Sequence, residues 1–378
     1  MANDFKIKNG LQLGGAFVEK VGTISGNADV DLSTGNVFDY TPTADATFTF
    51  SNAGETEHSF VLSVVGAEVA AGFDLANAAY DSVSFSVAGQ DPTPYGVFFK
   101  PDGTKMFISG DSNDSIYEYN LSTAWDISTA SFVQSFETAK NITTGMFFKP
   151  DGISFYLVDF ESVTVDQYLL NSAWDISTAS YVQSFNVSAQ DTVPIGLFFK
   201  DDGTKMYVLG VIGQDVNEYN LSTAWNISTA SFVQNLSLSA QETSPRVVFF
   251  KPDGLKMYIV GHAGDDVNEY DLSTAWDVST ASYSQNFSVA AQDTSPQGIF
   301  WGNNGTKMYI VGNSTDTIYQ YSTAGTPAPA TFTYPASVAW PSGTAPDAPA
   351  VGETDILEFS TTDGGTTWYG VRTGDAMA

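Results

Sequence analysis

Residues 98–107 read FFKPDGTKMF, and close variants of this phrase return four more times along the chain. The glycine that closes its turn recurs with spacings of 49, 51, 51 and 51 residues, at Gly103, Gly152, Gly203, Gly254 and Gly305. Repetition at a fixed period of about 50 residues indicates one supersecondary unit built several times around a shared, stacked core. The repeat therefore decides the fold of the central part of the chain.

One repeat has the pattern of a four-stranded antiparallel sheet. In the third copy, apolar runs at residues 196–199 and 206–209 flank the turn Asp202-Gly203, which predicts a hairpin. Residues 216–221 alternate between apolar and polar side chains, and residues 232–238 provide a fourth strand. Four-stranded units of this length are typical of β-propeller blades.

The two ends of the repeat region predict a closed ring. The fifth copy ends near Tyr321 without a fourth strand, whereas residues 80–87, ahead of the first copy, resemble the fourth strands of the other copies. A ring in which residues 80–87 complete the last blade leaves no sheet edge open. We therefore predict an all-β protein with a five-bladed propeller over residues 73–324. The consensus phrase KPDGTKMY with its following Val-rich strand resembles the blades of the YVTN and NHL superfamily, which implies a fold and not a function.

Composition excludes some function classes. The chain of 378 residues has 43 acidic and 14 basic side chains and a net charge of -29, so we expect no nucleic-acid partner. It has no cysteine, which excludes disulfides and thiolate metal sites. Because no run of eighteen apolar residues occurs and the first residues lack the apolar core of a signal peptide, we expect neither membrane insertion nor a secretion signal.

The two flanks, residues 1–72 and 325–378, are rich in strand patterns and poor in helix patterns. Neither flank alone offers enough strands for independent stability. We predict that together they form one split β-sandwich-like module, interrupted by the propeller. The ends of a closed ring lie close together, which makes such an insertion geometrically simple.

Four segments of these flanks carry a resemblance. They are NVFDYTPTADATFTFSN at 36–52, SFVLSVVG at 59–66, FTYPASVAWPSGTAP at 332–346 and DILEFSTTDGGTTWYG at 355–370. They resemble a β-module of virion structural proteins, especially tail fibres, of tailed bacteriophages that infect marine bacteria, and the opening DFKIKNGLQLGG is similar to the start of such proteins. The resemblance implies a virion protein assembled in the host cytoplasm, with other virion proteins as partners and a trimer as its own assembly.

Catalytic motifs are scarce. The only histidines, His58 and His262, lie outside any triad or metal-ligand motif, and no Gly-rich phosphate loop occurs. The second blade departs from the repeat through Glu137, Asp159, Glu161 and Asp166, which keeps a surface glycan hydrolase as a third hypothesis. We expect a protein that is not an enzyme.

The loops instead favour binding. On the face that carries the connections from fourth to first strand and from second to third strand, each blade except the second offers an amide next to a carboxylate. The candidate ligand-binding residues are Gln90, Asp91, Asp114, Gln190, Asp191, Asp215, Gln241, Glu242, Asp266, Gln292, Asp293 and Asp316. Such groups recognise sugar hydroxyls, and neighbouring carboxylates are also calcium ligands, although no cofactor is required. The alternative is that the carboxylates cap turns.

Tryptophans at a fixed blade position, Trp125, Trp174, Trp225 and Trp276, offer either stacking platforms for a polymer or packing between blades, and we favour packing. Near the C-terminus, Asp363 and Trp368 have the spacing of the Asp-box of carbohydrate-active proteins, but we favour a structural role in which Asp363 shapes a hairpin and Trp368 packs beneath it.

The first hypothesis is a phage tail fibre or spike component whose propeller binds a host-surface glycan or protein receptor. The alternative is a capsid decoration or head-fibre protein.

Overall fold

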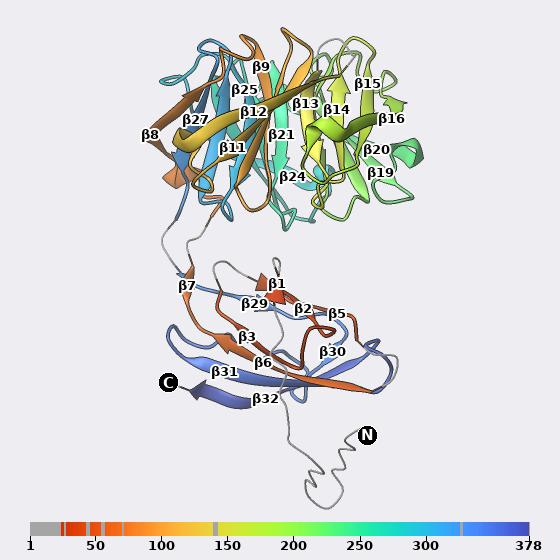
Figure 1. Ribbon diagram of the computed structural model, residues 1–378, viewed down its shortest axis with the longest axis vertical. Coiled ribbons are helices and arrows are strands. Elements are labelled where there is room, and N and C mark those ends of the chain that lie inside the picture. Colours follow the sequence, from red (N-terminus) through yellow and green to blue (C-terminus); the bar gives the residue numbers. More distant parts are fainter. Residues whose placement is uncertain are drawn as a thin grey trace, which may run out of the picture. The chain divides into compact units, whose positions relative to one another are not determined.

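The computed structural model describes residues 24–25, 28–42, 46–53, 57–69, 72–138, 143–325 and 328–377. The fold separates into two compact units. One comprises residues up to 71 together with residues 326–378, and the other comprises Gly72–Gly325. Both are built from strands (Figure 1), and within the described ranges no helix has the length and apolar character needed to span a bilayer.

The unit Gly72–Gly325 is a five-bladed β-propeller, as predicted. Each blade is a four-stranded antiparallel sheet, and the five innermost strands are neighbours around a closed ring. Blade 1 contains β9 (Pro94–Phe99), β10 (Lys105–Gly110), β11 (Ser115–Leu121) and β12 (Ala130–Glu137). Blade 2 contains β13 (Thr143–Phe148), β14 (Ser154–Asp159), β15 (Thr164–Leu170) and β16 (Ala179–Asn186). Blade 3 contains β17 (Pro194–Phe199), β18 (Lys205–Gly210), β19 (Asp215–Leu221) and β20 (Ala230–Ser237).

Blade 4 contains β21 (Pro245–Phe250), β22 (Lys256–Gly261), β23 (Asp266–Leu272) and β24 (Ala281–Ser288). Blade 5 combines β25 (Pro296–Gly302), β26 (Lys307–Gly312) and β27 (Thr317–Ser322) with β8 (Ala79–Ser86) from the start of the propeller. Figure 1 shows β8 beside β27. The two strands are antiparallel, with Phe85 opposite Ile318 and Tyr80 opposite Tyr321. The predicted closure of the ring by an upstream strand is thus confirmed.

The tryptophans fill the seams between blades, as predicted. Trp125 has a left-handed backbone conformation with φ of 67°, and its ring covers the turn glycine Gly103, whose φ is 71°. A Cβ atom at Gly103 would lie 2.4 Å from the Trp125 ring, so this position requires glycine. The other side of the Trp125 ring meets Gly302 of blade 5, and the Trp125 carbonyl accepts a hydrogen bond from the Tyr309 hydroxyl at 2.6 Å.

The fifth seam is filled by Phe73, which the sequence patterns did not reveal as a counterpart of the tryptophans. Phe73 shares their left-handed backbone, with φ of 62°. Its N–H bonds the carbonyl of the turn residue Gly305, as that of Trp125 bonds Gly103, and its own carbonyl accepts from the Tyr258 hydroxyl at 2.8 Å. The following 3₁₀ turn η2 (Leu75–Asn77) matches η3 (Ile127–Thr129) of blade 1. The closing segment therefore contributes a complete seam as well as a strand.

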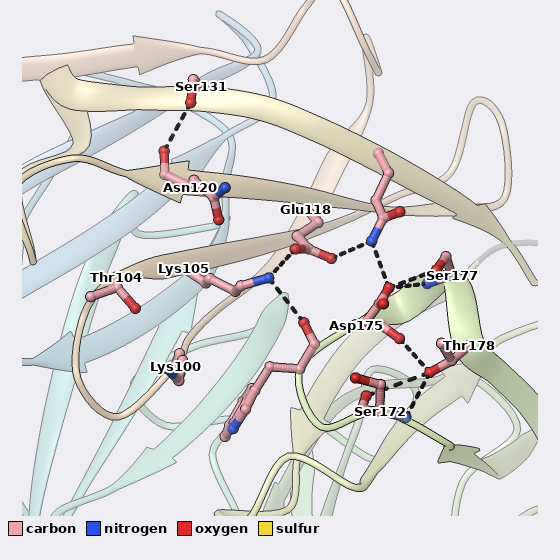
Figure 2. A network of polar contacts seen from close by, with 12 residues as sticks. Lys100, Thr104, Lys105, Glu118, Asn120, Ser131, Ser172, Asp175, Ser177 and Thr178 are labelled. Carbon is pink, nitrogen blue, oxygen red and sulfur yellow. Dashed lines mark hydrogen bonds and ion pairs between the residues drawn. The ribbon is translucent and has the colours of Figure 1, made fainter.

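A polar network ties neighbouring blades together across three of the seams, where a glutamine amide donates to the next blade. Figure 2 shows it between blades 1 and 2. The ammonium group of Lys105 pairs with the buried carboxylate of Glu118 and donates to the Trp174 carbonyl of the next blade at 3.2 Å. The Gln134 amide donates to Glu118 at 2.8 Å and to Asp175 of the next blade at 2.9 Å. The buried charge of Glu118 is thus both paired and hydrogen-bonded, as burial requires.

The other unit is organised around a five-stranded sheet of order β3-β6-β31-β32-β30. Its strands are β3 (Val37–Tyr40), β6 (His58–Val65), β30 (Val338–Ala339), β31 (Thr354–Thr361) and β32 (Trp368–Met377). The remaining strands form small sheets: β1 (Ile24–Ser25), β2 (Asp29–Asp31) and β5 (Thr49–Ser51) in one, β4 (Ala46–Thr47) with β29 (Phe332–Thr333), and β7 (Glu68–Val69) with β28 (Ala328–Pro329).

Chain segments from both sides of the propeller share the core of this unit. β6 pairs along its whole length with β31, from Thr361 opposite His58 to Thr354 opposite Val65. Val30 of β2 and Phe48, which lies between β4 and β5, belong to the same apolar core as Leu62, Phe359 and Trp368. The motif with the Asp-box spacing shapes a hairpin: the Asp363 carboxylate accepts from the Thr367 N–H at 2.9 Å, and Trp368 is buried beneath.

Candidate functional site

The carboxylates expected to bind a ligand are used inside the loops. Asp91, Asp191, Glu242 and Asp293 are all buried. Asp191 shows the pattern: its carboxylate accepts from the N–H groups of Val193 and Gly213, both at 2.6 Å, and so joins the loop before β17 to the turn after β18. Glu242 does the same with the N–H groups of Ser244 and Gly264. These four residues therefore act as the turn caps of the alternative interpretation.

The neighbouring glutamines are also engaged. In each of four blades the Gln side-chain oxygen accepts from the hydroxyl of a buried tyrosine, at 3.0 to 3.4 Å. The pairs are Gln90 with Tyr119, Gln190 with Tyr219, Gln241 with Tyr270 and Gln292 with Tyr321. The amide and carboxylate pairs hold the loops to the blades.

The other four candidates fall at two different positions of the repeat. Asp114 and Asp316 have left-handed backbones, with φ of 48° and 50°. Asp215 and Asp266 lie one position later in the repeat, and both are buried. Each carboxylate accepts hydrogen bonds from two asparagine amides, which for Asp266 are those of Asn268 and Asn286, both at 2.6 Å. Burial raises the pKa of Asp266 despite these bonds.

The departure of blade 2 from the repeat has a structural explanation. The position of Asp159 is glycine in the other blades, for example Gly110, where a Cβ atom would lie 2.3 Å from the Asp91 carboxyl carbon. In blade 2, Asp159 is itself the last residue of β14. Its carboxylate caps the following turn by accepting a hydrogen bond from the Ser162 N–H at 2.8 Å. Within the described part of the chain, no three His, Asp or Glu side chains gather to hold a metal ion, so we do not place the calcium site that we considered.

A different site lies at the axis of the propeller. Five identical phenylalanines, one from each innermost strand, form a closed ring of edge-to-face contacts, with centroids 5.1 to 5.6 Å apart and planes inclined by 66° to 74°. They are Phe98, Phe147, Phe198, Phe249 and Phe300. This geometry is the preferred one for aromatic quadrupoles, so the ring is a stable apolar lining of the channel.

The channel keeps a small cavity of about 40 Å³, whose lining includes these rings, glycine and apolar residues of the same strands, and one further residue of each blade. The further residues occupy one register position, near the start of each innermost strand, and are Tyr95, Thr144, Ile195, Arg246 and Gln297. We call this the mouth position. The cavity has room for a few water-sized groups, which suits one functional group of a larger ligand.

Buried polar atoms without a hydrogen-bond partner occur at three of the five mouth positions. Among the described residues, the hydroxyl oxygen of Thr144, Nε of Arg246 and the side-chain oxygen of Gln297 are buried and have no hydrogen-bond partner. The Thr144 and Gln297 residues are 2% and 6% exposed. An unpartnered buried polar atom destabilises a fold, so its presence at three of five mouth positions makes the mouth a candidate site for contact with a ligand.

Two ionisable side chains at the mouth, Arg246 and Tyr95, have shifted pKa values. Burial lowers the pKa of Arg246, against the opposing influence of Tyr95 and Glu242. Burial raises the pKa of Tyr95, and the charge of Asp111 adds to the effect. Asp111 follows β10 and is half-exposed, as are the residues at the same position of the other blades. We call these positions the rim: Asp111, Phe160, Val211, His262 and Asn313.

Motifs in the sequence do not reveal this site, because motifs are features that recur from blade to blade whereas the mouth position varies. The informative feature is a position whose residue differs in every copy of the repeat. Four positions of the innermost strand keep nearly the same residue in all five copies, whereas the mouth position carries five different side chains. One of them is Arg246, one of only two arginines in the chain.

Comparisons with known proteins add little beyond the fold. No protein-family model and no curated protein matches this chain. Among solved structures, it is similar to a luciferin-regenerating enzyme, with 12% identity over 65% of this chain and 95% of the other and a TM-score of 0.41. It is also similar to the periplasmic gluconolactonase of Pseudomonas aeruginosa, with 18% identity over 51% of this chain and 53% of the other and a TM-score of 0.34. A functionally unknown protein from Desulfotomaculum acetoxidans gives 15% identity, 62% and 70% coverage and a TM-score of 0.40.

These matches correct one expectation. We expected a protein that is not an enzyme, yet structures named as enzymes are among those with a similar arrangement of strands. A propeller of this kind therefore gives no reason to exclude catalysis, and we withdraw the expectation. At such identities and TM-scores, the names assign no reaction to this chain.

Proposed function

We propose that this protein is a structural component of a tailed-bacteriophage virion, a tail fibre or spike, whose propeller binds a glycan or protein receptor on the host surface through the mouth of its channel. The observation that supports binding is the mouth position itself. Its side chains differ between otherwise repeated blades, and three of them present buried polar atoms without partners. Diversity in a repeated framework is how repeat proteins build a specific site on a common scaffold.

The virion role is supported by the segments that resemble the phage module. Residues 36–52, 59–66 and 355–370 contribute β3, β6, β31 and the start of β32, which are neighbours in one sheet although the propeller separates them in sequence. The resemblance thus belongs to one folded unit and not to scattered phrases. In the proposed particle, this unit joins other virion proteins and further copies of the chain, a trimer in a fibre.

Electron microscopy of virions that carry this chain, labelled with antibodies against it, tests the virion role. Label at the tail supports the proposal. Label on the capsid would replace it with the decoration or head-fibre alternative, and particles without label would overturn it.

Retention of the purified, fluorescently labelled chain on host cells tests the binding role. Ile195→Trp is expected to abolish retention, because Ile195 lines the cavity and a larger side chain there fills it. Ile153→Trp is the matched control, since Ile153 is 40% exposed at the hairpin turn of blade 2 and does not line the cavity. Equal retention of both variants would move binding away from the mouth, and conversion of the ligand during the assay would assign a reaction to the site.

A further inference from the structure

The distribution of positive charge singles out one side chain. Among the described residues, every lysine lies within 4.0 Å of a carboxylate, and so does Arg372, which pairs with Asp355 at 3.0 Å. Arg246 is the one cation in these ranges without such a partner. In a chain with 43 acidic residues, an arginine acquires a carboxylate partner easily. The isolation of Arg246 at the mouth therefore indicates that its partner comes from outside.

The two neutral polar groups at the mouth, the Thr144 hydroxyl and the Gln297 amide, restrict the kind of ligand that can bind beside Arg246. The Thr144 hydroxyl can donate a hydrogen bond. The Gln297 amide nitrogen already donates to the Ser295 hydroxyl at 2.9 Å, which leaves the Gln297 side-chain oxygen as an acceptor. A ligand that satisfies all three groups brings acceptor oxygens to Arg246 and Thr144 and a hydroxyl donor to Gln297.

The size of the cavity favours a small planar anion. A guanidinium group forms two parallel hydrogen bonds to a carboxylate, and a carboxylate with an adjacent hydroxyl matches a cavity of about 40 Å³ better than a whole sugar ring does. The remainder of the ligand then lies over the rim. A phosphate or sulfate has further oxygens and needs additional donors, whereas Arg246 is the only cationic side chain in the lining.

We propose that the mouth binds the carboxylate of a hydroxy-acid sugar, such as a uronic acid of a surface polysaccharide, with Arg246 holding the carboxylate and Gln297 accepting from the adjacent hydroxyl. This inference rests on the proposed binding function and names its ligand class. Thr144 adds a hydrogen bond to a carboxylate oxygen.

Titration of the full chain with galacturonate, followed by NMR and calorimetry, tests the inference against galactose, the neutral sugar of the same stereochemistry, and against inorganic sulfate. We expect galacturonate to bind and galactose to bind at least about tenfold more weakly, since one charge-assisted pair contributes about a factor of ten or more. Arg246→Gln should remove this difference. Arg246→Lys should recover only part of it, because the forked geometry is lost.

Lys251→Gln is the matched control. It removes the same charge from the same blade, but Lys251 lies in the hairpin turn and pairs with Asp253 at 2.7 Å. Its affinity for galacturonate should stay within about twofold of wild type. Thermal melting confirms that each variant is folded, and Thr144→Val with Gln297→Leu provides a second pair of variants in case Arg246→Gln is unstable.

Equal affinity for galactose and galacturonate, tighter binding of sulfate, or unchanged binding by folded Arg246→Gln would each overturn the carboxylate assignment. If host-cell retention persists while galacturonate neither binds nor competes, the binding function stands and this inference fails. If galacturonate binds through Arg246 while host cells retain nothing, the inference stands and the host-surface function fails.

Discussion

Replacing Phe73 by alanine tests how the ring is closed. Phe73 is 9% exposed, stacks on Trp301 with centroids 5.3 Å apart, and occupies the seam where the other blades have tryptophan. Removal of a buried phenylalanine side chain typically costs about 3–5 kcal/mol. Alanine keeps a Cβ atom, so the strain of the left-handed backbone at φ of 62° is not relieved by the substitution. The whole loss of packing should therefore be seen as a lower free energy of unfolding. Such a loss is a large fraction of the ~5–15 kcal/mol that stabilises a typical domain.

Urea unfolding provides the free energy, and amide hydrogen exchange shows where the effect lies. We expect the amides of β8 to exchange faster in Phe73→Ala, because the closing strand loses its anchor, while those of β20 in blade 3 change much less. Phe132→Ala is the control: Phe132 is an aromatic of an outer strand but 46% exposed, so its removal should cost below about 1 kcal/mol. A loss below about 1 kcal/mol for Phe73→Ala, with unchanged exchange in β8, would refute this account of closure.

Three further predictions concern the closing strand, the caps and the second unit. Burial works against the ionised form of Asp81, but hydrogen bonds from Lys307, Ser322 and Gln320 and the charge of Lys307 lower its pKa overall. The stabilisation by ionised Asp81 is therefore present above about pH 4 and is lost as the pH falls further. In Asp81→Asn the melting temperature should fall less steeply with pH in this acidic range, and an unchanged pH dependence would contradict the prediction. Gly110→Ala should cost about 1–3 kcal/mol in urea unfolding because its Cβ atom would lie 2.3 Å from the Asp91 carboxyl carbon, whereas Gly89→Ala, with open space around it, should be near neutral. Residues 1–72 joined by a short linker to residues 325–378 should fold alone, since β6 and β31 pair fully; a circular dichroism spectrum of disordered chain would count against the split module.

Much of the propeller could be predicted because its determinants are local and repeated. A turn that needs glycine, two apolar runs beside it and a fixed period specify blades and their number, and the copy without a fourth strand identifies β8 as the closing strand. The role of Phe73 could not be read in this way. Its equivalence with the tryptophans rests on backbone conformation and on contacts with Gly305 and Tyr258, which appear only in three dimensions.

The candidate site shows the limit most clearly. The sequence by itself determined that amides and carboxylates recur on one face, but recurrence is also what turn capping produces, and the folded loops use those groups for capping. Only the tertiary structure brings Thr144, Arg246 and Gln297 from three blades to one cavity, because residues one to three repeats apart in the sequence meet when the ring closes. Whether a polar atom has a partner is a property of the packed fold, and that property distinguishes the mouth from the caps.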